Sequence, residues 1–483
     1  MIIRSLLMTR YESVRITEVQ LHDPVFAPRV DTVIRKTIPA CIRQSHKTGR
    51  IEAFKLDWKE GMPNKPHIYW DSDVAKVVEG MGWALALHPD AKFEAELEEY
   101  VELIISAQQP DGYLNIVFTT QRKEDRWKDL FNMHELYCAG HLMEAAVAHF
   151  YATGRRNFLD CMCRYADYIA SVFGTEEGKK HGYPGHEEIE LALCKLAKAT
   201  GNRKYFDLAA YFVNERGKSP NYFLAEQPWA GERELRNRQA HKPVREQADA
   251  EGHAVRAVYL YSGMADVAAE FNDATLSKAC ENLWNSIVNK RMYITGGIGS
   301  TWAGEAFTVD WNLANDTAYA ESCAAIGLVF FAQRMLNATG DGVYADVMEQ
   351  SLYNNALSGI SLDGEHFFYA NRLEVDDNSF EHGHISRTRQ EWFGCSCCPT
   401  NYCRFLPQLG SFAWSLGDGE VRLNMPVAGK LARGIEVSGA YPYDGKIAVR
   451  FTSGGKFKFS LRIPGWCEKY ELRLNGQVCT GRP

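Results

Sequence analysis

The chain has 483 residues, of which 46% are hydrophobic and 24% are charged, and its formal net charge is −7. This length and composition predict a globular protein of two or three domains, or one large closed barrel with an appendage. The acidic balance, without a basic stripe to neutralise phosphates, argues against a nucleic-acid partner.

The amino-terminal sequence and the pattern of cysteines indicate the cellular compartment. Residues 1–10 are apolar only in short bursts broken by arginine, a pattern typical of neither a signal peptide nor a membrane span. The 13 cysteines are odd in number and mostly isolated, which favours a reducing compartment over a disulfide framework. We therefore expect a cytoplasmic protein without a membrane partner.

Helical periodicity dominates from about residue 72 to residue 358. Glycine-containing breaks at 199–202 and 338–341 separate successive helices, which predicts antiparallel helix pairs. No fixed solenoid period is visible, so we expect a closed double ring of helices with a pocket at its centre. The predicted helices are Ala91–Gln108, Glu135–Thr153, Phe158–Phe173, Glu187–Thr200, Ala250–Phe271, Ala274–Lys290 and Tyr319–Leu336.

Three segments place histidine and carboxylate together at or near a helix start. They are His134 to His141, Gly182 to Glu188 and Arg245 to His253. A single histidine there is more often a cap or a satisfied core group. Three repetitions at equivalent places favour a shared polar pocket, and the nearby tyrosines and tryptophans are typical of sugar binding.

A glycine-rich loop follows, from Thr295 to Phe307. Its glycine spacing matches neither common nucleotide-binding pattern, which argues against a phosphate site. The alternative is a loop that delivers one carboxylate, Glu305, into a pocket, where it could act as a general acid. A solvent-exposed loop glutamate stays open as the other reading.

Cysteines gather at Cys395, Cys397 and Cys398, three within four positions. Adjacent cysteines form a disulfide only with severe strain, so a shared metal is the better interpretation, although buried unliganded thiols stay open. Because no second C-x-x-C pair is present, other ligands must come from a distance. Glu321 and Cys323, at an irregular helix start, would complete a tetrahedral zinc site with Cys397 and Cys398.

Alternation of apolar and polar residues begins near residue 418 and predicts an antiparallel β region. The expected strands lie in Ile447–Phe451, Phe457–Ile463 and Tyr470–Gly476. They are too few to close a sandwich, so we expect this region either to be incomplete at its C-terminus or to be completed by other parts of the chain.

Taken together, these segments resemble the glycoside hydrolase family 127 β-L-arabinofuranosidases over nearly the whole chain. The residues that carry the resemblance are His134-Glu135-Leu136-Tyr137, Gly140-His141-Leu142, Gly185-His186-Glu187-Glu188, Pro243-Val244-Arg245-Glu246-Gln247, Gly252-His253-Ala254, Gly296-Gly297-Ile298-Gly299-Ser300, Gly304-Glu305, Glu321-Ser322-Cys323, Phe367-Phe368-Tyr369 and Cys395-Ser396-Cys397-Cys398-Pro399.

The resemblance implies a mainly α fold: an (α/α)6 barrel catalytic domain, here residues 1–415, followed by a partial β-sandwich domain, residues 416–483. It implies zinc bound by Glu321, Cys323, Cys397 and Cys398, and retaining hydrolysis of terminal β-L-arabinofuranosides. Cys397 matches the nucleophile and Glu305 the acid/base. The positions that match sugar-contacting residues are His141, His186, His253, Tyr369 and Gln44.

The expected partner is a small arabinofuranoside or oligosaccharide, and a homodimer is one expected assembly. Family members usually run beyond this length, and Ala314 stands where the family is expected to have proline. Two other hypotheses stay open. One is an (α/α)6 glycosidase or lyase that uses carboxylates, with a purely structural zinc–cysteine site. The other is a carbohydrate-binding scaffold without catalysis.

Overall fold

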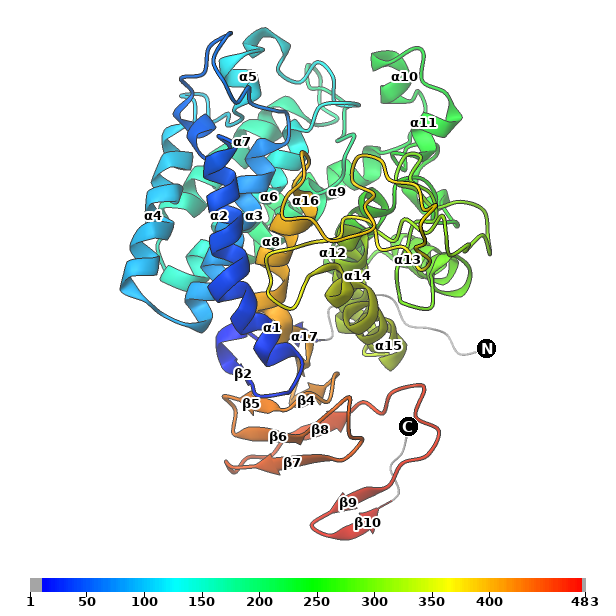
Figure 1. The fold of residues 1–483 in the computed structure, drawn as a ribbon. Helices are drawn as coiled ribbons and strands as arrows, with labels where there is room; N and C mark the ends of the chain where they lie inside the picture. Colours follow the sequence, from blue (N-terminus) through cyan, green and yellow to red (C-terminus); the bar gives the residue numbers. More distant parts are fainter. Residues whose placement is uncertain (1–10, 480–483) are drawn as a thin grey trace.

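A computed structural model describes residues 11–479 and has a helical body with β-sheets at one end (Figure 1). Among these residues, six helices contact one another in succession and close a ring, because the last also packs against the first. These inner helices are α3 (Trp70–Leu87), α6 (Glu135–Thr153), α8 (Ile189–Thr200), α12 (Ala254–Phe271), α14 (Ser322–Thr339) and α16 (Cys397–Phe405).

A second layer of helices packs outside the ring, each against an inner neighbour. It consists of α4 (Ala91–Ser106), α7 (Asn157–Val172), α9 (Lys204–Glu215), α13 (Ala274–Ser286), α15 (Gly342–Ser351) and the N-terminal run α1 (Phe26–Thr32), η2 (Val33–Thr37) and α2 (Ile38–Lys47). The expected double ring of an (α/α)6 barrel is therefore present in these contacts.

The inner and outer helices differ in how much of their surface is buried. Every residue of α3 from Trp70 to Leu85 is buried, as a helix surrounded on all sides requires. On α4 only Leu97, Val101 and Ile104 are buried, a single stripe at helical spacing. The outer helices therefore cover the ring and present their polar faces to solvent.

Glycine turns set the direction of the inner helices. Helices α6, α8 and α14 end at Gly154, Gly201 and Gly340, each with a φ near +70°, a left-handed conformation that glycine adopts at little cost. Each turn leads at once into an antiparallel outer helix, which returns the chain to the end where it started. The inner helices consequently run in the same direction and gather their N-termini at one end of the ring.

A buried arginine ties the last inner helix to its neighbours. Arg404 of α16 pairs with Glu79 of α3 (3.2 Å) and with Glu144 of α6, and donates to the Tyr259 hydroxyl of α12 (3.1 Å). Since all of these groups are buried, the charges are compensated by one another rather than by water.

The seven predicted helices are confirmed, with shifts of a few residues at their ends. The predicted helix that ends at Lys290 finishes in a π-helical turn, η6 (Ile287–Arg291). Helix α16 was not predicted as a helix. Shorter helical segments connect the main ones: η1 (Ile16–Glu18), η3 (Glu52–Lys55), α5 (Val117–Thr120), η4 (Lys123–Asp125), α10 (Tyr222–Glu226), α11 (Glu232–Arg236), η5 (Val244–Glu246), η7 (Leu352–Ala356), η8 (Leu357–Gly359), η9 (Leu406–Gln408) and α17 (Leu409–Phe412).

Two four-stranded sheets and a hairpin form the β region at the end of the ring opposite the inner-helix N-termini (Figure 1). One sheet has the order β1-β3-β4-β8, the other β2-β5-β6-β7, and β9 pairs with β10. The strands are β1 (Glu12–Ser13), β2 (Val19–Leu21), β3 (Trp414–Gly417), β4 (Glu420–Leu423), β5 (Gly429–Leu431), β6 (Ile435–Gly439), β7 (Ile447–Phe451), β8 (Lys458–Leu461), β9 (Leu472–Leu474) and β10 (Gln477–Cys479).

The predicted antiparallel pairing is confirmed for every described strand pair but one. Strands β4 and β8 pair in parallel, with Val421 opposite Phe459, so the region is not antiparallel throughout. The N-terminal strands β1 and β2 join β3 and β5, so other parts of the chain do contribute strands to the sheets. Strand β3 crosses the expected boundary at residues 415 and 416, and the division of the chain at that point stays a prediction. Among residues 11–479, no helix combines the length and apolar character that crossing a bilayer requires.

Candidate active site

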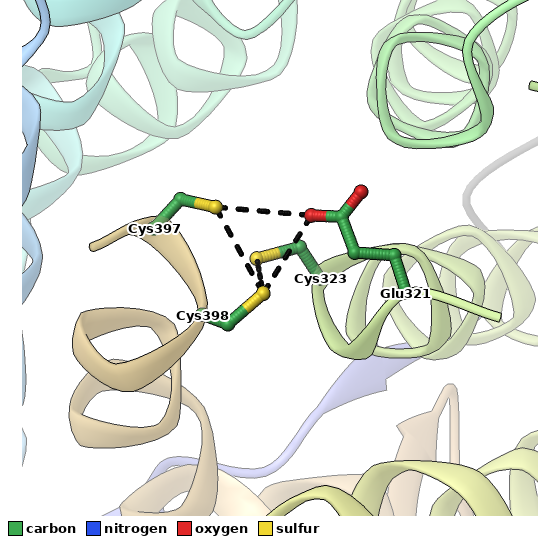
Figure 2. A group of neighbouring side chains, drawn as sticks. All are labelled: Glu321, Cys323, Cys397 and Cys398. Atoms are coloured by element: carbon green, nitrogen blue, oxygen red, sulfur yellow. Dashed lines mark hydrogen bonds between the residues drawn. The ribbon is translucent and has the colours of Figure 1, made fainter. Parts of the chain in front are cut away.

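Four potential metal-ligating side chains converge where the N-termini of α14 and α16 meet (Figure 2). The Cys398 sulfur lies 3.3 Å from that of Cys323 and 3.8 Å from that of Cys397. Glu321 Oε1 lies 3.7 Å from the Cys397 sulfur and 3.6 Å from the Cys398 sulfur. The ligands predicted from two distant segments are thus brought together.

Helix geometry explains the convergence. Glu321 is the residue before α14 and Cys323 lies in its first turn, while Cys397 and Cys398 open α16. The first-turn N–H groups of a helix have no intrahelical partner and carry partial positive charge, which favours thiolates and carboxylates. Pro399 is tolerated in the first turn of α16 for the same reason, because its missing N–H would have no partner there.

Arg50 holds the segment before α16 in place. Its guanidinium donates to Asp73 (2.9 Å), to the Gly394 carbonyl (2.8 Å) and to the Ser396 hydroxyl (3.1 Å). The same group lies over the rings of Trp70 and Trp392, at 5.0 and 5.3 Å. A buried, fully engaged arginine of this kind restricts where Cys397 can point.

A carboxylate oxygen of Glu305 lies within 4.8 Å of one of Glu321. The two oxygens of Glu305 accept hydrogen bonds from His253 Nε2 (2.7 Å) and from the Tyr319 hydroxyl (2.8 Å). His253 Nδ1 accepts from the backbone N–H groups that start α12, so Nε2 carries the proton. Burial alone would raise the pKa of Glu305, but the His253 and Tyr319 hydrogen bonds lower it to about 2.

The backbone around both carboxylates is strained. Glu305 has a φ of +53° and Ala320, directly before Glu321, has a φ of +40°. Residues other than glycine seldom adopt this region, and where they do the surrounding structure maintains it, frequently at functional sites. The Glu305 backbone is pinned by its carbonyl, which accepts from Ala254 N at 3.0 Å.

Histidines from the three predicted segments lie against one another, while their role in a sugar pocket stays a prediction. His186 lies between His134 and His253, with ring centroids 5.6 and 5.4 Å away, and Tyr137 packs on it at 4.3 Å. Burial lowers the pKa of His134 to about 3 and that of His186 well below its usual value. Neutral imidazoles of this kind can both donate and accept hydrogen bonds, as sugar hydroxyls require.

The other three predicted sugar-contacting residues differ in their distance from the cysteine cluster and in their burial. The Tyr369 hydroxyl lies 3.0 Å from the Cys397 sulfur and 3.9 Å from that of Cys395. His141 is completely buried behind Tyr137, with Nδ1 3.2 Å from Glu188. Gln44 lies half-buried on α2, and its side chain makes no hydrogen bond to a described residue.

Sequence reasoning missed Tyr319 and Arg50. Tyr319 precedes Glu321 by two residues, so its position next to a carboxylate signal was visible, but its direction toward Glu305 depends on the strained backbone at Ala320. Arg50 lies more than 340 residues from Gly394 in the chain, and no local pattern connects the two.

The fold and this arrangement of thiols, carboxylates and neutral histidines are those of a carbohydrate-active enzyme, and comparison with known proteins supports that class. The family profile described as the GH127 catalytic domain of β-L-arabinofuranosidase matches residues 18–411. The profile of the GH127 middle domain matches residues 421–483. The chain therefore belongs to glycoside hydrolase family 127 and is a glycoside hydrolase.

Individual relatives agree with this assignment. A non-reducing end β-L-arabinofuranosidase of Bifidobacterium longum subsp. longum is 39% identical over 445 residues, which are 86% of this chain and 67% of the relative. The crystal structure of a GH127 β-L-arabinofuranosidase from Geobacillus stearothermophilus T6 is 43% identical, has a TM-score of 0.91, and covers 96% of this chain and 77% of its own. A second GH127 β-arabinofuranosidase structure is 37% identical with a TM-score of 0.89, over 98% of this chain and 77% of the other.

Proposed function

We propose that this protein is a zinc-dependent retaining hydrolase that releases terminal β-L-arabinofuranosyl residues, with Cys397 as nucleophile and Glu305 as acid/base. The observation that carries the proposal is the position of the Cys397 sulfur. This sulfur belongs to a four-ligand cluster and contacts the Tyr369 hydroxyl. Glu321, another member of the cluster, also lies next to Glu305.

The spacing of the four ligands fits zinc. A tetrahedral ion with bonds of about 2.3 Å to sulfur and about 2.0 Å to oxygen separates sulfurs by about 3.8 Å and sulfur from oxygen by about 3.5 Å. The measured sulfur–sulfur contacts of 3.3 and 3.8 Å and sulfur–oxygen contacts of 3.6 and 3.7 Å are close to these values. When bound, zinc would hold the ligating thiols as thiolates at neutral pH.

The chain's own residues supply the two chemical steps. In the first, the Cys397 thiolate attacks the anomeric carbon while the bond from that carbon to the leaving oxygen breaks, and Glu305 gives its proton to that oxygen. In the second, Glu305 takes a proton from water, the water oxygen bonds to the anomeric carbon, and the carbon–sulfur bond breaks to restore the thiolate. Two displacements retain the anomeric configuration.

Glu305 must change protonation state between these steps. The hydrogen bonds from His253 and Tyr319 favour the carboxylate, which the second step requires. The first step requires the acid, and burial, which raises the pKa of Glu305, favours it.

The side chains next to these groups suit a small furanoside. His186 packs on His253, and Tyr369 packs on Tyr319. His253 and Tyr319 both donate to Glu305, and we assign His186, His253 and Tyr369 to contacts with sugar hydroxyls. The same role stays a prediction for two other residues, His141 behind Tyr137 and Gln44 on α2. A homodimer, a cytoplasmic location and the absence of nucleic-acid or membrane partners also stay predictions.

A second candidate is hydrolysis by two carboxylates, with the metal purely structural. The observation that favours it is the approach of Glu305 and Glu321 within 4.8 Å, since retaining glycosidases hold two carboxyl groups about 5 Å apart. Against it, Glu321 Oε1 contacts two cysteine sulfurs and is therefore engaged within the cluster.

The test is hydrolysis of p-nitrophenyl β-L-arabinofuranoside, with the α-anomer as control. Release of nitrophenolate from the β-anomer alone is the expected result, and proton NMR of early time points should show the β-sugar forming first. Mass spectrometry of the trapped enzyme should find the sugar on the peptide containing Cys397. Sugar binding without release would instead indicate a binding scaffold, and a sugar attached to Glu321 would indicate the two-carboxylate mechanism.

A further inference from the structure

An exposed aromatic cluster lies on two loops that also lead to the proposed catalytic residues. Trp302, Phe380 and His382, here called the rim aromatics, have ring centroids 5.8 to 5.9 Å from one another. Trp302 is 52% exposed and Phe380 is 49% exposed. Exposure of large apolar rings to water is unfavourable, and the free energy falls when a ligand or partner covers them.

Trp302 is coupled to Glu305 through one tight turn. The Glu305 N–H donates to the Trp302 carbonyl at 3.1 Å, and the Ala306 N–H donates to Thr301 at 3.0 Å. Gly304 and Glu305 both adopt positive φ, of +75° and +53°, to close this turn. The turn therefore fixes the backbone of Trp302 relative to that of Glu305, the residue that we assign as acid/base.

His382 is coupled to the nucleophile side through a short backbone pairing. His382 and Ile385 exchange two backbone hydrogen bonds, of 3.1 and 2.9 Å. Between them, His384 stacks on Tyr369 with ring centroids 4.3 Å apart and an interplanar angle of 17°. Tyr369 in turn contacts the Cys397 sulfur, so the loop that carries Phe380 and His382 also reaches the proposed nucleophile.

The side of the site on which the rim aromatics lie follows from the chemistry. A nucleophile and a general acid act on opposite sides of the bond that breaks, and the acid contacts the leaving oxygen. The sugar attached to that oxygen must therefore extend past Glu305, away from Cys397. Trp302 belongs to the turn that carries Glu305, and we infer that its ring lies on this side.

We propose that Trp302, Phe380 and His382 form the subsite for the leaving-group sugar, where the rings pack on the C–H face of a second pyranose or furanose. This inference rests on the proposed function. Aromatic faces suit sugar C–H surfaces, and the His382 ring can in addition hydrogen-bond a sugar hydroxyl. The Trp302 indole N–H makes no hydrogen bond to a described residue, so it is available to a ligand.

The test compares two substrates that share the cleaved bond and differ only in the leaving group. One is a β-L-arabinofuranosyl-L-arabinose disaccharide, and the other is methyl β-L-arabinofuranoside, whose methanol leaving group is too small to reach the rim aromatics. For Trp302→Ala the ratio of kcat/KM for the disaccharide to that for the methyl glycoside should fall about fivefold to tenfold, mainly through KM. Trp302→Phe should restore most of the ratio.

Phe380→Ala is the second variant, because it lies on the other loop and leaves the Glu305 turn intact. Its ratio should fall in the same direction. Trp466→Ala is the matched control: Trp466 is 65% exposed but lies beside Tyr441 in the β region, and its ratio should match the wild type.

The results distinguish failure of the leaving-group subsite from failure of the proposed function. An unchanged ratio in both Trp302→Ala and Phe380→Ala overturns the leaving-group subsite while the proposed function stands. A parallel loss on both substrates in Trp302→Ala, with no effect of Phe380→Ala, also overturns it, since Trp302 would then act only by shaping the Glu305 turn. A wild-type enzyme that cleaves neither substrate overturns the proposed function and the subsite with it.

Discussion

The Tyr319 hydroxyl donates a 2.8 Å hydrogen bond to Oε1 of Glu305, and the two residues reach this contact from the start of α14 and from the glycine-rich loop. Tyr319 is almost completely buried, so no water replaces the bond if it is lost. The hydroxyl therefore fixes the direction of the carboxylate that we assign as acid/base.

Tyr319→Phe should lower kcat about fivefold, corresponding to ~1 kcal/mol for one lost hydrogen bond. The matched control is Tyr293→Phe, in the same connection between η6 and α14, which loses a 3.1 Å bond to the Ala314 carbonyl without touching Glu305. Steady-state kinetics on the aryl glycoside measure both. Equal losses in the two variants would show that Tyr319 acts on the loop and not on Glu305.

Cys397→Ser should abolish turnover, by on the order of a thousandfold or more, because serine is not ionised where the thiolate attacks. The fold should persist, as the other cluster residues and the Arg50 contacts stay in place. Circular dichroism and thermal melting check the fold. Cys163→Ser, a half-buried thiol of α7, is the control and should behave as wild type. Normal activity in Cys397→Ser would remove the nucleophile assignment.

Glu305→Gln should lose most activity on glycosides with poor leaving groups and retain more on an activated aryl glycoside, whose departure needs no proton. A plot of log kcat/KM against leaving-group pKa should be steeper than for the wild type. Glu251→Gln is a suitable control because Glu251 lies two residues from His253 but pairs with Arg236. A uniform loss across leaving groups would argue against the acid role.

Removal of metal with a chelator should abolish activity and lower the melting temperature, and zinc should restore both, since an ion bound only by the folded state stabilises it. Elemental analysis of Cys323→Ser should show less zinc than the wild type, a readout that does not depend on turnover. Full zinc content in that variant would exclude Cys323 as a ligand.

The buried carboxyl group of Glu135, next to His134 in the chain, leads us to predict a pH dependence of stability. Burial raises its pKa to about 8, although hydrogen bonds from Tyr113 (2.5 Å) and the Trp127 N–H (2.9 Å) partly oppose this. Between pH values of about 4.5 and 8 the folded protein then holds a proton that the unfolded chain releases, so stability falls as pH rises.

Glu135→Gln should remove this contribution, which has a slope of up to about 1.4 kcal/mol per pH unit. Urea unfolding at several pH values gives the difference from the wild type. Exposed Glu177→Gln is the control and should leave the wild-type slope unchanged. An unchanged slope in Glu135→Gln would show that Glu135 is ionised in the fold.

Several helices and strands and the cysteine cluster could be predicted because their sequence signals lie within a few residues. Helical periodicity identified Glu135–Thr153 with its observed ends, and alternation identified Ile447–Phe451 as a strand. The cysteine spacing at 395–398 indicated a metal, because adjacent thiols have few other uses. Motifs spread over the chain then indicated the family, and the family profiles confirm it.

What the sequence determined by itself was the set of elements and of reactive side chains, since each depends on contacts within a few residues. Only the tertiary structure decided which of them meet. The ring closes α16 against α3, which sets Arg50 against Gly394, and the parallel inner helices bring Glu321 beside Cys397. The parallel pairing of β4 with β8 and the direction of Tyr319 toward Glu305 likewise depend on packing between distant segments, which no local pattern records.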